Sequence, residues 1–113
     1  MPTPSKVKIG GAEYALHIDA RKWNSCKEKD GCAGLTDLHN QEIFVDPTMS
    51  LSNIKETVLH ECLHAIFADS GVSWPFPARA QEETIVRVVS PRLLQFILDN
   101  TELVEWLTHG SDS

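Results

Sequence analysis

The sequence lacks any run of about 18 apolar residues, the length that a membrane-spanning helix requires. Its first residues, MPTPSKVKIGG, lack the apolar core of a signal peptide. We therefore expect a cytoplasmic protein with no membrane partner. Basic residues are also few, because ten Lys and Arg stand against 16 Asp and Glu and leave a net charge of −6. Such a chain offers no basic surface for phosphates, so we expect no nucleic-acid partner.

Cysteine is scarce as well, with three residues in a chain that shows no signal peptide, which predicts free thiols instead of a disulfide framework. Cys26 and Cys32 lie six positions apart in a polar segment, which is not the CxxC spacing of metal and redox motifs. We interpret these two as ordinary loop thiols. Cys62 falls inside a predicted helix and fits the pattern of a small buried apolar residue.

The sequence does contain enough apolar material for one folded domain. With 113 residues, of which 42% are apolar, it predicts a single domain over residues 1–113. Two short alternating runs, Lys6–Ile9 and Glu13–Ile18, flank the dipeptide Gly10-Gly11. This pattern predicts a β-hairpin, because the glycines supply the positive φ angles of a tight turn.

A second hairpin is predicted further along the chain. Residues 35–38 and 42–45 flank a polar turn, and Pro47 prevents the second of these strands from continuing. Residues 19–34 lie between the two hairpins and show no regular apolar period. They predict either a short helix or an irregular crossover.

Three helices are predicted in the second half of the chain. The clearest begins at Ser50 or Ser52, either of which can act as its N-cap, and ends at Gly71. Its apolar stripe consists of Ile54, Val58, Leu59, Leu63, Ile66 and Phe67. A second stripe consists of Ile85, Val86, Val89, Leu93, Leu94 and Ile97. Pro91 interrupts this stripe, so we expect a kink or a break near Ser90. A last short helix is predicted at residues 103–107.

The motif HExxH occurs on the clearest predicted helix, as the sequence His60-Glu61-Cys62-Leu63-His64. Residues four apart lie above one another on a helix, so His60 and His64 can hold one metal ion. Glu61 lies about 100° around the helix from His60, beside the ion instead of on it. It can therefore accept the proton of a metal-bound water, which is the chemistry of a zinc metalloprotease.

A catalytic zinc site usually has three protein ligands, so one more must come from elsewhere in the chain. The extended metzincin motif is excluded, because Phe67 and Ser70 stand where that motif has Gly and His. Glu82 and Glu83 begin the next predicted helix, and either carboxylate can complete a His₂Glu site. Helical periodicity slightly favours Glu82. An acidic first turn that stabilises the helix dipole is the alternative explanation for this pair.

Three segments of the chain resemble the short phage- and prophage-encoded relatives of the ImmA/IrrE-type metallopeptidases, a minimal gluzincin-like group within the HExxH zincins. The segments are GLTDLHNQEIFVD, ETVLHECLHAIF and EETIVRVVSPRLLQFILDN, and together they span most of the chain. HECLH is the most specific element. The sequence departs from the larger gluzincins at Arg87, where those enzymes have an aspartate.

The resemblance implies a zinc-dependent metalloendopeptidase in which His60, His64 and Glu83 hold Zn²⁺. Glu61 is then the general base. The resemblance further implies a protein or peptide substrate, often a repressor or another phage or host regulatory protein, and a location in the cytoplasm of a bacterial host. In zincins an extended substrate pairs with an edge strand before the metal helix, which would be residues 43–45 here.

The fold class that we expect is α+β and zincin-like. A small, largely antiparallel sheet would pack on the HExxH metal helix, and a helix that carries the third ligand would follow. The competing hypothesis for function is a catalytically weak or inactive zinc-binding module that recognises a partner protein through the same groove.

Overall fold

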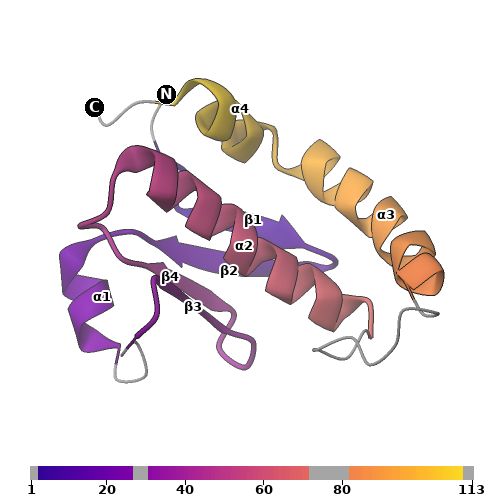
Figure 1. The fold of residues 1–113 in the computed structure, drawn as a ribbon, viewed down its shortest axis with the longest axis horizontal. Helices are drawn as coiled ribbons and strands as arrows, with labels where there is room; N and C mark the ends of the chain where they lie inside the picture. Colours follow the sequence, from indigo (N-terminus) through magenta and orange to yellow (C-terminus); the bar gives the residue numbers. More distant parts are fainter. Residues whose placement is uncertain (1–2, 27–30, 72–81, 111–113) are drawn as a thin grey trace.

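The computed structural model describes residues 3–26, 31–71 and 82–110, apart from the side chains of residues 82–84, 86 and 87. Over these ranges the chain forms one four-stranded sheet and four helices, so the predicted α+β class is confirmed (Figure 1). None of these helices has both the length and the apolar character that a membrane span requires.

The sheet is built from the two predicted hairpins. β1 (Lys6–Ile9) pairs antiparallel with β2 (Ala12–His17), and Gly10 in the turn between them has a φ of 63°. β3 (Gly34–Asp37) pairs antiparallel with β4 (Glu42–Val45). Both hairpins are therefore confirmed, with strand ends within one residue of the predicted ones.

The two hairpins are joined by a parallel pairing of β2 with β4, which gives the strand order β1-β2-β4-β3. The sheet is therefore mixed, with antiparallel pairing within each hairpin and parallel pairing between them. Parallel neighbours need a long crossover connection, and the helix α1 (Ala20–Ser25) lies in it. Trp23 is the buried anchor of α1. The predicted connection between the hairpins thus contains a short helix.

The expectation that residues 43–45 form an edge strand is wrong, because β4 lies inside the sheet between β2 and β3. Ile43 and Val45 are completely buried, with exposed fractions of 0%. A strand with such side chains takes an inner position, where neighbouring strands on both sides exclude water. The edge at this end of the sheet is β3, in which every residue is half-buried.

α2 (Leu51–Asp69) confirms the predicted motif helix and lies across one face of the sheet (Figure 1). It begins after Ser50, whose Oγ accepts a hydrogen bond from the Asn53 N–H at 3.3 Å. The residues that α2 buries are Ile54, Val58, Glu61, Cys62, Ala65 and Ile66. Leu59 is 39% exposed, so the predicted apolar stripe is wrong at that position.

α3 (Glu82–Asp99) runs through Pro91 as one helix, so the helix does not end near Ser90. Pro91 is exposed, where water can reach a backbone carbonyl that has lost its N–H partner. Hydration of this carbonyl offsets part of the cost of a proline inside the helix.

The apolar stripe of α3 differs from the predicted one. Val89 and Phe96 are buried, because α3 contacts α2 and β1 with a single face. Leu94 and Ile97, which belong to the predicted stripe, are 58% and 43% exposed. The sequence pattern alone does not distinguish the two apolar faces of this helix.

Asn100 links the last two helices to strand β1 through hydrogen bonds. It lies between α3 and α4 (Thr101–His109), the predicted last helix, and its side chain is buried. The Asn100 amide bonds both backbone groups of Lys8, since Oδ1 accepts from the N–H and Nδ2 donates to the carbonyl, each at 2.8 Å. Nδ2 also donates to the Phe96 carbonyl at 2.8 Å. One side chain thus joins α3, α4 and β1.

We expect Asn100→Ala to lower the free energy of unfolding by about 1–3 kcal/mol, because it leaves part-buried backbone groups of Lys8 without partners. Urea denaturation at neutral pH measures this loss. Asn40→Ala is the control, since it makes the same substitution but removes a side-chain hydrogen bond, from Nδ2 to Asp37, on the exposed surface. Equal losses in the two variants would contradict the role given to Asn100.

Candidate metal centre

His60 and His64 lie one turn apart on the more exposed side of α2, and both line a cavity that β3 also borders. Their Nε2 atoms are 3.1 Å apart, and the rings meet edge to face with an interplanar angle of 81°. Two nitrogens at this separation, each about 2.05 Å from a shared ion, subtend an angle of about 100°. This angle is close to tetrahedral, so the separation of the two nitrogens fits a shared metal ion.

Glu61 lies beside the histidines at the boundary between α2 and the sheet. Its side chain is buried, with an exposed fraction of 7%. Its Oε1 accepts a hydrogen bond of 2.7 Å from the Thr36 hydroxyl on β3. Ligand atoms of His60, Glu61 and His64 all lie within 4.8 Å of one another. Among the described residues these three form the one such group of potential metal ligands.

Gly34 allows β3 to approach α2 closely at this point. A Cβ on Gly34 would lie 2.7 Å from the Thr57 methyl carbon and 3.0 Å from the Glu61 Cγ. Both distances are shorter than ordinary carbon contacts, which are about 3.5–4.0 Å. The absence of a side chain at this position therefore lets the strand pass directly beside Glu61.

A cavity of about 890 Å³ lies between α2 and β3 and contains the histidines and Glu61 in its wall. Such a volume is within the range of pockets that bind small molecules or short peptide segments. Gly34, Leu35 and Thr36 line one side, and apolar side chains such as Phe67 on α2 line another part. His60, Glu61 and His64 thus face a space large enough for a small molecule or a peptide segment.

Along this cavity, some backbone hydrogen-bonding groups of β3 point away from β4 and make no hydrogen bond to another described residue. The Asp46 N–H donates to the Ala33 carbonyl at 2.9 Å, so Ala33 and Asp46 form a hydrogen-bonded pair at the end of the β3–β4 ladder. Hydrogen-bonded pairs alternate along an antiparallel ladder. The next hydrogen-bonded pair is therefore Leu35 with Phe44. The N–H and C=O groups of Gly34 and Thr36 point the other way, to the open edge of the sheet. An extended peptide can pair with these groups.

The three cysteines are all free, and they lie in different surroundings. Cys62, inside the motif, is completely buried, and this burial raises the pKa of its thiol to about 12, with a smaller contribution from the Glu61 charge. Such a thiol is inert, as expected of a small apolar residue. Cys32 is exposed at the wall of the cavity, whereas Cys26 is half-buried.

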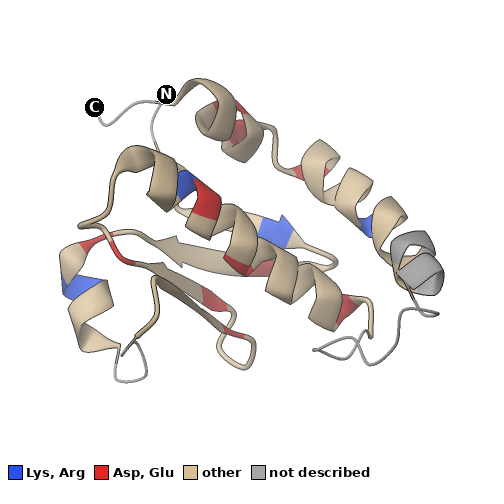
Figure 2. Cartoon of the chain, viewed as in Figure 1, with Lys and Arg blue, Asp and Glu red and all other residues tan. Residues whose placement is uncertain are grey.

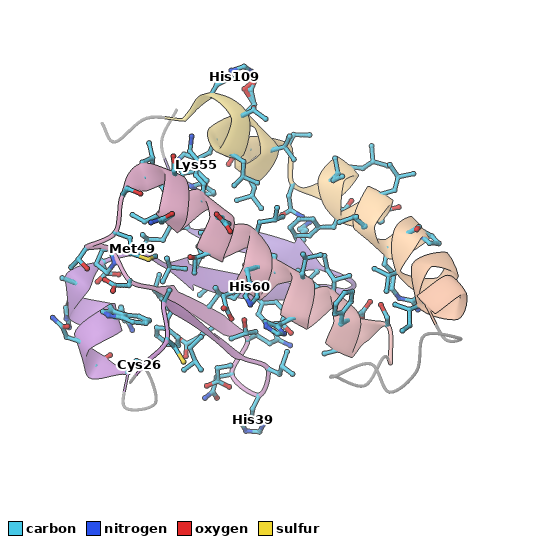
Figure 3. All side chains as sticks on the ribbon, viewed as in Figure 1. Cys26, His39, Met49, Lys55, His60 and His109 are labelled. Atoms are coloured by element: carbon cyan, nitrogen blue, oxygen red, sulfur yellow. The ribbon has the colours of Figure 1, made fainter. Side chains whose placement is uncertain are left out.

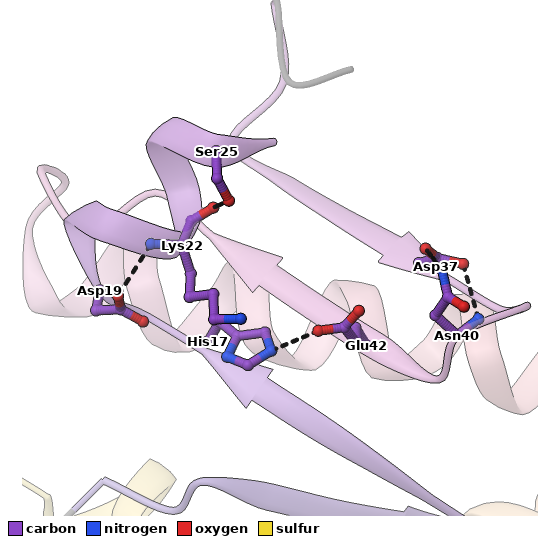
Figure 4. Close-up of polar contacts among 7 residues, drawn as sticks. All are labelled: His17, Asp19, Lys22, Ser25, Asp37, Asn40 and Glu42. Carbon is purple, nitrogen blue, oxygen red and sulfur yellow. Dashed lines mark hydrogen bonds and ion pairs between the residues drawn. The ribbon is translucent and has the colours of Figure 1, made fainter. Parts of the chain in front are cut away.

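The other described histidines lie away from this centre. His39 is at the tip of the β3–β4 turn and points away from His60 (Figure 3). His17 lies on β2, where its Nε2 is 2.9 Å from Glu42 Oε2 (Figure 4). Glu42 alternates along β4 with the buried Ile43, so this ion pair is on the opposite face of the sheet from α2.

The two candidates for a third ligand, Glu82 and Glu83, are the first residues of α3. Their side chains lie outside the described residues, so the prediction of Glu83, with Glu82 as its alternative, stays a prediction. The helix that carries them contacts α2, which is the arrangement that a ligand from this helix requires.

Charged residues of the described chain are distributed over several elements. Figure 2 shows basic residues separately on α1, α2, β1 and α3, with acidic residues between them. Lys55 near the start of α2 donates to the Gly110 carbonyl at 2.9 Å and lies over the Trp106 ring. The cavity wall carries Glu56 and Glu61 as its acidic residues and no Lys or Arg from the described part of the chain.

Sequence reasoning did not identify two residues of this site, Thr36 and Gly34. Both precede the motif by about 25 positions and carry no metal-binding chemistry of their own. The single local signal is the small size of Gly34 directly before a predicted strand, which is typical of a close backbone approach. Their role becomes visible when β3 is placed beside α2.

Comparison of the chain with protein-family models, with curated proteins and with solved structures finds no match. What this centre does must therefore be argued from its residues and their geometry.

We expect Gly34→Ala to lower the free energy of unfolding by roughly 1–3 kcal/mol, because the added methyl group overlaps Thr57 and Glu61. Urea denaturation measures the change. Gly11→Ala is the control, since no atom lies within 4 Å of a Cβ added there. A loss in Gly34→Ala no larger than in Gly11→Ala would show that β3 is not held against α2 as described.

The purified protein should contain about one divalent metal ion per chain, and His60→Ala and His64→Ala should lose it because one imidazole alone holds an ion weakly. Inductively coupled plasma mass spectrometry of wild type and variants measures the content. His39→Ala should retain the metal, since this exposed histidine lies in the β3–β4 turn.

The same measurement on Glu82→Ala and Glu83→Ala identifies the third ligand as the position whose loss releases the ion. A metal content that is equal in His60→Ala, His64→Ala and His39→Ala would contradict the proposed centre.

Proposed function

We propose that this protein is a zinc-dependent metalloendopeptidase of the HExxH type. The observation that carries the proposal is the arrangement of His60, His64 and Glu61. Two imidazole nitrogens lie 3.1 Å apart, a buried carboxylate lies within 4.8 Å of them, and all three residues line one cavity. Imidazole and carboxylate groups are the ligands and the base that zinc hydrolases use.

Zinc fits the donor set better than a harder ion, because two imidazoles suit borderline metals whereas magnesium and calcium prefer oxygen ligands. His60 and His64 would hold the zinc ion, with Glu83, or Glu82 as its alternative, as the third ligand. Bound zinc supplies a Lewis acid for the substrate carbonyl and lowers the pKa of a bound water to about 7. A nucleophile is then available at neutral pH.

Glu61 has the role of general base in this proposal. Its carboxylate lies between the two histidines and β3, because one of its oxygens contacts Thr36 and the other lies near Gly34. A water between the metal and a peptide on β3 would therefore be within its reach. Glu61 takes the proton of that water and then delivers it to the amine that leaves.

The substrate in this proposal is a protein segment in extended form. The free N–H and C=O groups of Gly34 and Thr36 would pair with its backbone, as in other cases of strand addition to a sheet edge. Pairing along β3 places the peptide over the cavity that contains the histidines. A phage or host regulatory protein, such as a repressor, is the substrate class that the family resemblance suggests.

A second candidate function is a zinc-binding module that recognises a partner protein without cleaving it. The free edge of β3 favours this function too, because strand pairing gives affinity without any chemistry. Glu61 distinguishes the two candidates, since a recognition module does not need a general base.

We expect Glu61→Gln to keep its metal and to lose hydrolysis by about 10²–10⁴-fold, the usual contribution of a general base. The probe is a mixture of synthetic peptides together with denatured casein, and fragments are counted by mass spectrometry. Glu102→Gln makes the same chemical change on α4 and serves as the control. Full activity in Glu61→Gln would contradict the mechanism. Peptide binding without cleavage by the wild type would favour the recognition module.

A further inference from the structure

Thr36 connects the peptide-binding edge to the general base. Its hydroxyl donates to Glu61 Oε1 at 2.7 Å, and the Glu61 backbone carbonyl lies 3.1 Å from the same oxygen. A threonine hydroxyl has one proton, so the shorter contact, to the carboxylate, receives it. The backbone of the same residue faces the open edge of β3.

We infer that Thr36 is a positioning residue that orients the Glu61 carboxylate and couples this orientation to peptide binding. The inference rests on the proposed function, because it assigns Thr36 a part in the same hydrolysis. Thr36 does not touch the reacting atoms in this account. It acts through Glu61.

The Thr36 hydroxyl matters to Glu61 because the Glu61 side chain is buried. A carboxylate that is 7% exposed has little water to bond with, so it depends on protein donors. Among the hydrogen bonds of the described residues, the Thr36 hydroxyl is the donor to this carboxylate. Bonds from a hydroxyl to an ionised carboxylate are short and strong, and 2.7 Å is at the upper end of their range of about 2.5–2.7 Å.

The β-branched side chain makes Thr36 suitable for this role. Threonine on a strand has few χ1 rotamers, so its hydroxyl direction follows the backbone. A peptide that pairs with the Thr36 N–H and C=O would fix this backbone at the strand edge, where its neighbours Leu35 and Asp37, but not Thr36 itself, bond to β4. The peptide would thereby also fix the hydroxyl and, through it, the Glu61 carboxylate.

This coupling predicts which kinetic constant depends on the hydroxyl. Thr36→Val has nearly the same shape and keeps the backbone groups, so peptide binding and KM should change less than about twofold. It removes a charge-assisted hydrogen bond, so kcat should fall roughly 10- to 100-fold. Thr36→Ser keeps the hydroxyl and should retain kcat within about threefold. Thr108→Val removes a hydroxyl from α4, outside the cavity, and should leave both constants unchanged.

A double variant tests whether Thr36 acts through Glu61. Thr36→Val combined with Glu61→Gln should be no slower than Glu61→Gln alone, because the hydroxyl then has no carboxylate to orient. A further loss in the double variant would overturn the inference. A rise in KM with unchanged kcat in Thr36→Val would overturn it as well, since it would place Thr36 in binding alone.

A readout without activity separates this inference from the proposed function. With ¹³C-labelled glutamate, the carboxyl signal of Glu61 is assigned by its disappearance in Glu61→Gln. The signal should move in Thr36→Val and stay in place in Thr36→Ser, while both variants keep the metal content of the wild type. An unmoved signal in Thr36→Val overturns the inference. If the signal moves in Thr36→Val as expected but the wild type cleaves no peptide, hydrolysis is refuted and the contact between Thr36 and Glu61 stands.

Discussion

The packing of one face of α2 against the sheet determines where His60, Glu61 and His64 point. Val58, Cys62 and Ala65 are buried on the sheet, so the helical period of 3.6 residues places His60 and His64 on the more exposed side. Glu61, the residue after His60, then lies at the boundary where β3 passes α2. A rotation of the helix by one residue would bury a histidine and separate Glu61 from the strand.

The strand order supplies the other half of the site. The parallel pairing of β2 with β4 leaves β3 at the edge of the described sheet, and its outer side lies along the cavity. The same four residues of β3 therefore present backbone groups at this edge and donate a hydroxyl to Glu61. Close contact is required for both contributions, and Gly34 permits it because any larger residue would meet α2.

Patterns of short range in the sequence predict the hairpins, the motif helix and the pair of histidines. Each of these depends on residues a few positions apart, whose geometry the helix or turn fixes. The edge strand and the roles of Thr36 and Asn100 could not be predicted in this way. They depend on contacts between residues 25 and 92 positions apart, which follow from the strand order and from the docking of α3. The two apolar faces of α3 were ambiguous for the same reason, since tertiary contacts decide which one is buried.

The burial of Glu61 is itself an argument for function. Its neighbours on the inner face of α2 are apolar, and burial of a carboxylate beside a neutral hydroxyl costs several kcal/mol relative to an apolar side chain. A helix that served the fold alone would be more stable with an apolar residue at this position. The carboxylate becomes favourable when a cation lies nearby, and His60 and His64 are placed to hold one within a few ångströms. A local conflict of this kind between stability and chemistry is typical of a functional site, and here it occurs at the residue that the proposed hydrolysis uses as its general base.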